Sequence, residues 1–137
     1  MAEYLIDNGA IPLLIKHSNV LVFDSVVIHD SAILSLFTCI SSDTTIGKFF
    51  HANVFSFVAH DCSVGDFVTF GPGVKCNGNV MIKNHAYIGA GAVIKQGSRQ
   101  NPIIIGEKAV VGMGAIVTKS ISAGTVVIGN PARQQLK

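Results

Sequence analysis

The chain contains no tryptophan, and only 13% of its 137 residues are Asp, Glu, Lys or Arg. Disordered segments are rich in charge and poor in apolar residues, whereas this sequence is 49% hydrophobic and contains 14 glycines. A disordered or linker-like chain is therefore excluded. A chain of this length forms a single domain, and we expect most of it to be buried in one core or shared among several copies.

Long uninterrupted apolar runs are also missing. Asp24 and Asp30 interrupt the most apolar stretch, and a membrane-spanning helix needs roughly 18 or more apolar residues in succession. Met1 is followed by Glu3 and Asp7 instead of the basic and apolar regions of a signal peptide. The sequence therefore predicts no membrane partner and a cytoplasmic location.

Cysteine is scarce, and the spacing of the cysteines shows no pairing motif. The three cysteines, Cys39, Cys62 and Cys76, form no Cys-x-x-Cys motif. An odd number without such a motif argues against a disulfide framework and against a zinc knuckle. We interpret them as small buried residues.

Acidic residues are nearly absent from the second half of the chain. Residues 1–66 carry a formal charge of −5, whereas residues 67–137 carry +7 and contain Glu107 as their one acid. A basic half suits an anionic small ligand such as a phosphorylated cofactor. Nucleic acid is not expected as a partner, because the Lys and Arg residues form no cluster and no recognition helix is evident.

The most informative pattern is a repeat of six residues. Every sixth residue from residue 28 is apolar for twelve positions, and after a slip of five residues the series resumes. Its members are Ile28, Leu34, Ile40, Ile46, Ala52, Val58, Val64, Phe70, Cys76, Ile82, Ile88 and Ile94, then Ile105, Val111 and Val117. The period is neither that of a helix nor that of an alternating strand.

A small residue usually stands four positions after each of these apolar residues, and glycine often follows directly. Short extended segments with one inward side chain and frequent glycine describe a chain that turns a corner every six residues. Three such turns close a triangle, so each coil contains eighteen residues and stacks on the next. The repeat predicts about five coils.

The ends and one internal segment differ from this repeat. We divide the chain into an N-terminal segment or cap (1–27), a β-helix (28–128) and a C-terminal tail (129–137). Within the cap, residues 3–16 are expected to form a short helix broken at Gly9 and Pro12. The register slip predicts a loop at residues 96–104 that bulges from a corner.

On this repeat, the sequence resembles the hexapeptide-repeat acyltransferases. The resemblance implies an all-β, single-domain, left-handed parallel β-helix and assembly into homotrimers. Handedness comes from the resemblance alone, because the general rule for parallel crossovers favours the right-handed form.

One histidine stands where acyl transfer could occur. His60 occupies the third place of its hexad, where a side chain points outward, and Gly78 follows eighteen residues later in the same column. Adjacent coils lie about 4.8 Å apart. We therefore expect an imidazole beside an exposed backbone N–H, which supplies a base and an oxyanion donor.

The segment Val-Ala-His-Asp-Cys-Ser-Val-Gly-Asp-Phe-Val (58–68) resembles the one that carries the catalytic histidine in bacterial nucleotide-amino-sugar N-acetyltransferases and sialic-acid O-acetyltransferase-like proteins. The resemblance implies that His60 is the general base, that Asp61 orients its ring, and that the Gly78 N–H faces the thioester carbonyl. Asp61 could instead bond only local backbone, and Gly78 could serve a positive φ at the corner.

The resemblance also implies acetyl-CoA as co-substrate, bound in a groove between neighbouring subunits, and no metal. Ala90 and Met113 would offer backbone groups to the pantetheine arm. Thr69 stands where some relatives have a second histidine near the cofactor, and it is a further candidate contact. Lys95, Lys119 and Arg133 are candidate partners for the coenzyme phosphates.

Phenylalanines form two columns outside the predicted core. Phe49 and Phe67 are eighteen residues apart, as are Phe37 and Phe55, so each pair should stack across coils. Exposed rows of Phe are unfavourable unless covered. A trimer contact is the preferred interpretation and a wall of the acceptor pocket is the alternative, while Phe50 is expected inside.

Three functional hypotheses remain. The first is an acetyl-CoA-dependent acetyltransferase acting on the amine or hydroxyl of a small acceptor, a sugar and preferably a nucleotide-linked one. Such relatives usually carry an N-terminal α/β domain, which we do not expect in residues 1–27, so the alternatives are a truncated enzyme without its acceptor-binding domain and a non-catalytic trimeric scaffold. A metal-dependent hydratase is disfavoured because His51, His60 and His85 share no column.

Overall fold

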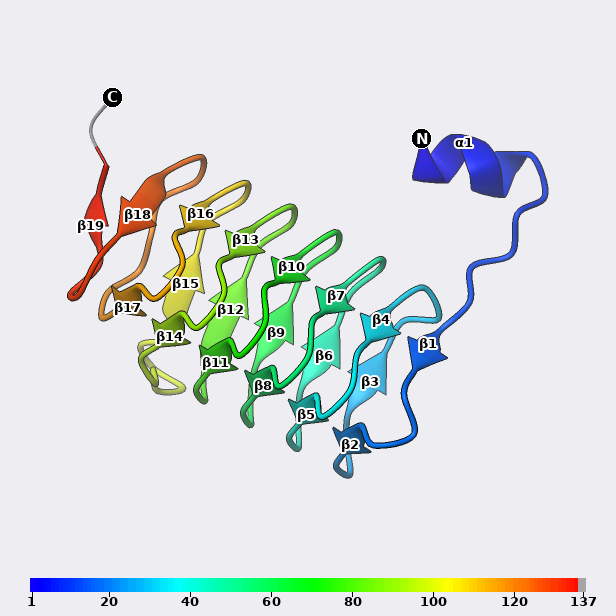
Figure 1. The fold of residues 1–137 in the computed structure, drawn as a ribbon, viewed down its shortest axis with the longest axis horizontal. Coiled ribbons are helices and arrows are strands. Elements are labelled where there is room, and N and C mark those ends of the chain that lie inside the picture. Colours follow the sequence, from blue (N-terminus) through cyan, green and yellow to red (C-terminus); the bar gives the residue numbers. More distant parts are fainter. Residues whose placement is uncertain (136–137) are drawn as a thin grey trace.

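The computed structural model describes residues 1–135 and shows a parallel β-helix built from stacked triangular coils (Figure 1). The last two residues of the predicted tail lie outside the described part. The coils run in sequence order along the long axis of the molecule, with the N-terminal end at one extreme and the C-terminal end at the other. Each side of the triangle is a sheet of very short strands.

Sheet A forms the first side of the triangle. Its strands, in spatial order, are β1 (Ile15–Lys16), β4 (Ile33–Leu34), β7 (His51–Ala52), β10 (Thr69–Phe70), β13 (Tyr87–Ile88), β16 (Val110–Val111), β18 (Val126–Ile128) and the antiparallel β19 (Arg133–Gln134).

Sheets B and C form the other two sides. Sheet B contains β2 (Leu21–Val22), β5 (Cys39–Ile40), β8 (Phe57–Val58), β11 (Lys75–Cys76), β14 (Val93–Ile94) and β17 (Ile116–Val117). Sheet C contains β3 (Val27–Ile28), β6 (Thr45–Ile46), β9 (Ser63–Val64), β12 (Val80–Ile82) and β15 (Ile103–Ile105).

The strand register reproduces the predicted spacing. Phe57 pairs with Lys75, eighteen residues later, and Tyr87 pairs with Val110 after the five-residue slip. Parallel pairing lets each coil satisfy the backbone groups of the next, as in the bond from the Ala59 N–H to the Cys76 carbonyl (2.8 Å). Residues eighteen apart therefore lie one above the other.

The core lies along the axis of the triangle. The apolar positions of the hexad from Leu34 to Val117 are all buried, because they are the last residues of their strands and point inward. Phe50 is fully buried and packs edge to face on Phe70, with ring centroids 5.1 Å apart. Cys62 and Cys76 are buried, Cys39 is half-buried, and all three are free thiols.

Three columns of corners connect the sheets. Corner AB joins sheet A to sheet B and includes residues 53–56, corner BC joins B to C and includes 59–62, and corner CA joins C to A and includes 65–68. One residue at many corners adopts a positive φ. Corner BC uses Asp, Ser and Asn there, whereas Phe37, Phe49, Phe55 and Phe67 hold the position at the other two corners, although bulky residues are disfavoured in this conformation.

The solenoid begins earlier than residue 28. β1 and β2 already pair with β4 and β5, so the fold has about six coils rather than about five. The hexad missed the first coil because Lys16 occupies the inward column position of β1, and Lys16 is exposed at the open end. The helix α1 (Ala2–Asp7) ends before Gly9, and its first residue, Ala2, lines a cavity together with Phe67 and His85 of the solenoid.

The register slip is a loop between β14 and β15. It ends at Pro102, two residues before the predicted boundary, because Ile103 already pairs with Val80. Among the residues described, no helix has the length and apolar character that crossing a membrane requires.

Candidate active site

His60 lies at corner BC, between β8 and β9. The corner is tied to both neighbouring coils: the Asp61 N–H donates to the Ser42 carbonyl (3.2 Å), and the His60 carbonyl accepts from the Asn79 N–H (3.1 Å). The His60 side chain points outward and remains 49% exposed. A substrate can therefore reach the ring.

The imidazole lies against Gly78 of the next coil. A Cβ built on Gly78 would stand 2.7 Å from both Cε1 and Nε2 of His60, so the ring occupies the space that a side chain would need. The eighteen-residue spacing correctly predicts this neighbour, but Gly78 is buried instead of exposed because the ring covers it. Within the described chain the Gly78 N–H has no hydrogen-bond acceptor.

The other ring nitrogen of His60 faces Asp61. Nδ1 lies 2.7 Å from Oδ2 of that carboxyl group. An ionised carboxylate can only accept hydrogen bonds, so Nδ1 carries the proton in the neutral ring and Nε2 keeps its lone pair. The geometry therefore leaves Nε2, on the side of Gly78, free to accept a proton.

Asp61 reaches both of its partners because of its backbone. Its φ of +55° places it in the left-handed region, which Asp tolerates better than most residues. Its carboxylate bonds His60 and also Arg99, whose Nη2 donates to Oδ1 over 3.3 Å. The hydrogen bond from His60, and to a smaller extent Arg99, holds the pKa of the Asp61 carboxyl below its ordinary value despite partial desolvation.

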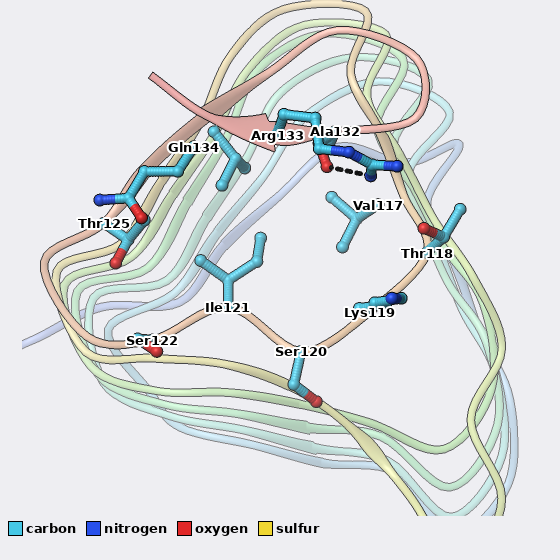
Figure 2. Close-up of a pocket in the computed structure, with 11 residues that line it drawn as sticks. Val117, Thr118, Lys119, Ser120, Ile121, Ser122, Thr125, Ala132, Arg133 and Gln134 are labelled. Atoms are coloured by element: carbon cyan, nitrogen blue, oxygen red, sulfur yellow. Dashed lines mark hydrogen bonds between the residues drawn. The ribbon is translucent and has the colours of Figure 1, made fainter. Parts of the chain in front are cut away.

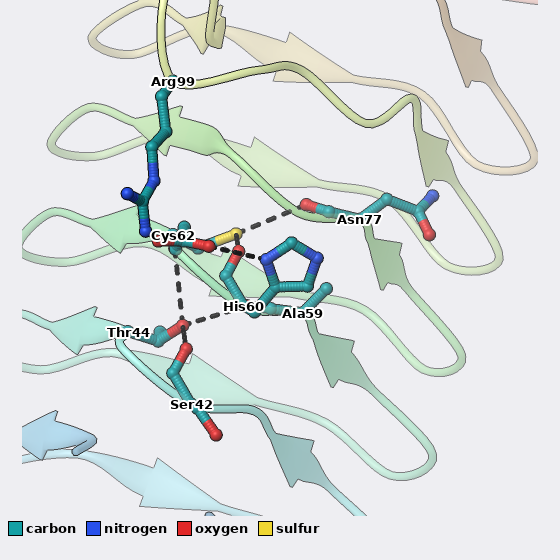
Figure 3. A network of polar contacts seen from close by, with 8 residues as sticks. Ser42, Thr44, Ala59, His60, Cys62, Asn77 and Arg99 are labelled. Carbon is teal, nitrogen blue, oxygen red and sulfur yellow. Dashed lines mark hydrogen bonds and ion pairs between the residues drawn. The ribbon is translucent and has the colours of Figure 1, made fainter. Parts of the chain in front are cut away.

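A buried network supports the corner from inside (Figure 3). The Thr44 hydroxyl donates to the Ala59 carbonyl (2.9 Å) and accepts from the Cys62 N–H (3.4 Å). The Cys62 thiol lies 3.3 Å from the Asn77 carbonyl. The Thr44 bonds tie the corner of His60 to the preceding coil, and the Cys62 contact ties it to the coil of Gly78.

A surface cavity of about 350 Å³ lies on the sheet C side of corner BC, and Asp61 lines it, whereas His60 and Gly78 do not. Its lining includes Asp43, Asp61, Asn79 and Arg99. The cavity therefore combines two carboxylates and one guanidinium, and of these groups the Asp61 carboxylate contacts the imidazole.

The structure places the predicted pantetheine contacts at a different corner. Ala90 and Met113 occupy one column of corner AB, where the Gly114 N–H donates to the Ala90 carbonyl (2.8 Å), and Met113 is 82% exposed. Corners AB and BC stand at opposite ends of sheet B. Within one protomer these two residues are therefore not brought to His60 and Gly78.

Thr69 and Lys95 are also separated from each other. Thr69 is half-buried on sheet A, in register between His51 and Tyr87. Lys95 follows β14 and is exposed at corner BC, on the coil above Gly78. Of the two, Lys95 lies on the same corner as His60.

Lys119 and Arg133 do come together. Both line a cavity of about 380 Å³ at the C-terminal end of the solenoid, which also exposes hydroxyl groups of Ser120 and Thr125 (Figure 2). Arg133 belongs to β19, which folds back over the last coil, and its guanidinium donates to the Ala132 carbonyl (3.0 Å). The fold thus gathers two of the three predicted phosphate partners around one hollow.

The histidines do not form a metal centre. His51 lies in β7, His60 at corner BC and His85 at corner CA. Among the residues described, no group of three His, Cys, Asp or Glu side chains could hold a metal ion. The donor set required by a metal-dependent hydratase is not assembled within the described protomer.

The aromatic columns stack as predicted. The ring centroids of Phe49 and Phe67 are 4.9 Å apart, and those of Phe37 and Phe55 are 5.3 Å apart. The first column continues into His85, whose ring is parallel to that of Phe67 at 4.9 Å. The sequence pattern missed His85, although the same eighteen-residue step from Phe67 leads to it.

Sequence reasoning also missed Arg99. Column arithmetic places the loop of residues 96–102 above Gly78 and therefore over corner BC, but it does not tell which loop side chain turns toward Asp61. The contact depends on the conformation of the loop, which the repeat does not specify.

The fold is similar to that of β-helix acetyltransferases in comparisons with known proteins. The chain is 56% identical over all of its 137 residues to GDP-perosamine N-acetyltransferase from Escherichia coli O157:H7. The match covers 62% of that protein. It matches WeeI from Acinetobacter baumannii AYE at 54% identity with a TM-score of 0.96, over 98% of this chain and 63% of that one. PerB from Caulobacter crescentus, solved with CoA and GDP-perosamine, matches at 25% identity with a TM-score of 0.93, over 98% and 63%.

No protein-family model matches the chain. The resemblance to the hexapeptide-repeat acetyltransferases is nevertheless confirmed by these relatives, and with it the left-handed parallel β-helix fold. The chain spans a little over 60% of the length of the relatives that it matches.

Proposed function

We propose that this chain is the β-helix part of an acetyl-CoA-dependent acetyltransferase that acts on the amino group of a nucleotide-linked sugar. One observation carries the proposal: Nε2 of His60 lies against Gly78, whose N–H has no acceptor among the described residues, while Nδ1 is held by Asp61 at 2.7 Å. A base and an oxyanion donor side by side are what acyl transfer from a thioester requires.

His60 would remove a proton from the acceptor amine as its nitrogen attacks the thioester carbonyl. The N–H of Gly78 would donate a hydrogen bond to the oxygen of the tetrahedral intermediate. When the C–N bond has formed and the C–S bond breaks, His60 would return its proton to the departing sulfur. The products are the acetylated amine and CoA thiol, and Asp61 remains ionised throughout because its pKa is lowered.

The preference for an amine rests on the relatives. A histidine base serves an amine or a hydroxyl, so the site alone leaves both open. The names of two matched proteins, GDP-perosamine N-acetyltransferase and the PerB complex with GDP-perosamine, support an amino sugar linked to a nucleotide. The cytoplasmic location stays a prediction.

The placement of the candidate coenzyme residues supports a homotrimer. Gly78 lies at corner BC, whereas Ala90 and Met113 lie at corner AB, at the other end of sheet B. A coenzyme extended along one corner of a rigid prism cannot reach both sets in one protomer. We therefore place the thioester on Gly78 of one copy and the pantetheine arm on the equivalent of Ala90 and Met113 in its neighbour.

Phosphate binding would take place near the C-terminal end. Lys119 and Arg133 share a cavity there, and two cations with nearby hydroxyl groups suit a phosphate. Lys95 lies on corner BC between His60 and that end, in line with a coenzyme that runs along the corner. The contribution of Thr69 stays a prediction, since its position on sheet A is far from corner BC within the protomer.

Calorimetric titration of the purified chain with acetyl-CoA tests the proposal. We expect one site per protomer, followed by acetyl transfer to GDP-perosamine as probe acceptor. A correctly folded trimer that binds no acetyl-CoA would contradict the proposal and favour a non-catalytic scaffold. Binding without transfer would indicate an enzyme that requires its acceptor-binding domain.

A further inference from the structure

The loop that interrupts the repeat is docked on the corner that carries the site. The Gly97 N–H donates to the Gly78 carbonyl (2.9 Å), and the Ile103 N–H donates to the Asn79 carbonyl (3.2 Å). The two ends of the loop are therefore bonded to Gly78 and Asn79, which lie one coil above His60 and Asp61. The five extra residues stand directly over this corner.

The loop is closed on itself. The N–H groups of Ser98 and Asn101 donate to each other's carbonyl groups at 3.0 and 3.1 Å, and the Ser98 hydroxyl also accepts from the Asn101 N–H. Gly97 permits the close approach, since a Cβ there would clash with the Asn79 carbonyl and come within 2.6 Å of the Ile103 nitrogen. Arg99 and Gln100 consequently occupy a defined tip.

From that tip the Arg99 side chain points down toward the corner of His60 (Figure 3), where it bonds the Asp61 carboxylate. Its Nη2 bonds Oδ1 of the carboxylate at 3.3 Å, while Oδ2 is bonded to His60 at 2.7 Å. Each carboxylate oxygen therefore has its own partner. The Arg99 side chain is 80% exposed, so its electrostatic contribution is screened and modest, but the two bonds together restrict rotation of the carboxylate.

We propose that Arg99 is a positioning residue for acetyl transfer, which holds the Asp61 carboxylate in the orientation that fixes the His60 ring against Gly78. This inference rests on the proposed function. It gives the register slip a role, because an uninterrupted hexad would turn the corner without a loop to carry a guanidinium. Arg99 acts through Asp61 and makes no contact with the imidazole among its described bonds.

The first test needs no catalytic activity. In ¹³C NMR of the carboxyl groups, we expect the titration midpoint of Asp61 to move to higher pH in Arg99→Gln, because a nearby cation that lowers this pKa is removed. Asp43, which lines the same cavity, is observed in parallel as an internal reference. Gln100→Ala, a change at the same loop tip, should leave the Asp61 midpoint in place. An unchanged midpoint in Arg99→Gln overturns the inference, whether or not the chain is active.

The second test uses the transfer reaction. Arg99→Gln should lower kcat by about three- to tenfold, as loss of an outer partner of a catalytic group does, with the KM for acetyl-CoA unchanged. Arg99→Lys should restore part of the loss, and Gln100→Ala should match the wild type. A raised KM for acetyl-CoA with an unchanged kcat would make Arg99 a ligand of the coenzyme phosphates and overturn the inference. A folded wild type that neither binds acetyl-CoA nor transfers its acetyl group, but shows the expected Asp61 shift, would instead contradict the proposed function alone.

Discussion

The imidazole of His60 fills the space beside Gly78 that any other residue would need for its side chain. The two residues belong to successive coils and are eighteen positions apart, and a Cβ on Gly78 would come within 2.7 Å of Nε2. Glycine is required here by close approach, since Gly78 is not among the glycines with a positive φ. The base and the N–H donor thus meet only because one of them has no side chain.

Gly78→Ala should therefore displace the His60 ring without unfolding the chain. The ring is the far end of a side chain and can rotate away, so we expect turnover to fall by about tenfold or more while the melting temperature changes little. Steady-state kinetics and thermal unfolding measure the two effects.

Gly73→Ala is the matched control. Gly73 has a φ of +69° and open space around it, so an added methyl group meets no neighbour but strains the backbone. This variant should lose about 1 kcal/mol of stability and keep its turnover. Equal losses of turnover in the two variants would contradict a specific role for the space beside Gly78.

Asp61→Asn tests the orientation of the ring. Asn tolerates the same positive φ, but its amide can donate to Nδ1 and stabilise the wrong tautomer. We expect kcat to fall by at least about tenfold. A kcat equal to that of the wild type would support the local-backbone interpretation of Asp61.

The stability difference between the wild type and Asp61→Asn is expected to depend on pH. The folded-state pKa of Asp61 lies below its ordinary value of 3.8, chiefly because of the bond to His60. The stabilisation is therefore complete above pH 3.8 and is lost as the pH falls through the lower, folded-state value. Chemical denaturation should show the wild type more stable than Asp61→Asn at pH 6, with the difference shrinking in acid. A difference that grows as the pH falls would contradict this assignment.

The column formed by Phe49, Phe67 and His85 is expected to be a subunit contact. A carboxylate in the middle of the stack would be buried between copies, so Phe67→Glu should give monomers in sedimentation velocity. If the coenzyme groove lies between copies, acetyl-CoA binding should disappear together with the trimer. A persistent trimer would favour the alternative, in which the column forms a wall of the acceptor pocket.

The cavity near the C-terminal end predicts a dependence on phosphate. In the double variant Lys119→Gln and Arg133→Gln, we expect acetyl-CoA to bind about tenfold or more weakly at low salt. Acetyl-3′-dephospho-CoA is the control ligand, and its affinity should change less if these cations contact the 3′-phosphate. Equal affinities of wild type and variant for acetyl-CoA would remove both residues from the coenzyme site.

The fold could be predicted because its core residues recur at one position of the hexad. Each coil buries the same position of the hexad, so the repeat from Ile28 to Val117 indicates a solenoid without knowledge of contacts between distant residues. The first coil was not predicted from the repeat for a physical reason. At the open end no preceding coil covers Lys16, so that position need not be apolar. Handedness required the resemblance.

The site could be predicted only as far as the columns reach. The eighteen-residue step places Gly78 beside His60, and the five-residue slip places Met113 in the column of Ala90. The burial of Gly78 depends on the rotamer of His60, and the contact of Arg99 depends on a loop outside the repeat. Neither follows from spacing, because both depend on side-chain directions at corners.

His60→Ala tests the central claim most directly. With acetyl-CoA and GDP-perosamine as substrates, we expect turnover to fall by about 100-fold or more, while calorimetry shows nearly unchanged affinity for acetyl-CoA because Gly78 and the coenzyme contacts remain. Unchanged turnover in a folded His60→Ala variant would remove His60 from the chemistry and contradict the account.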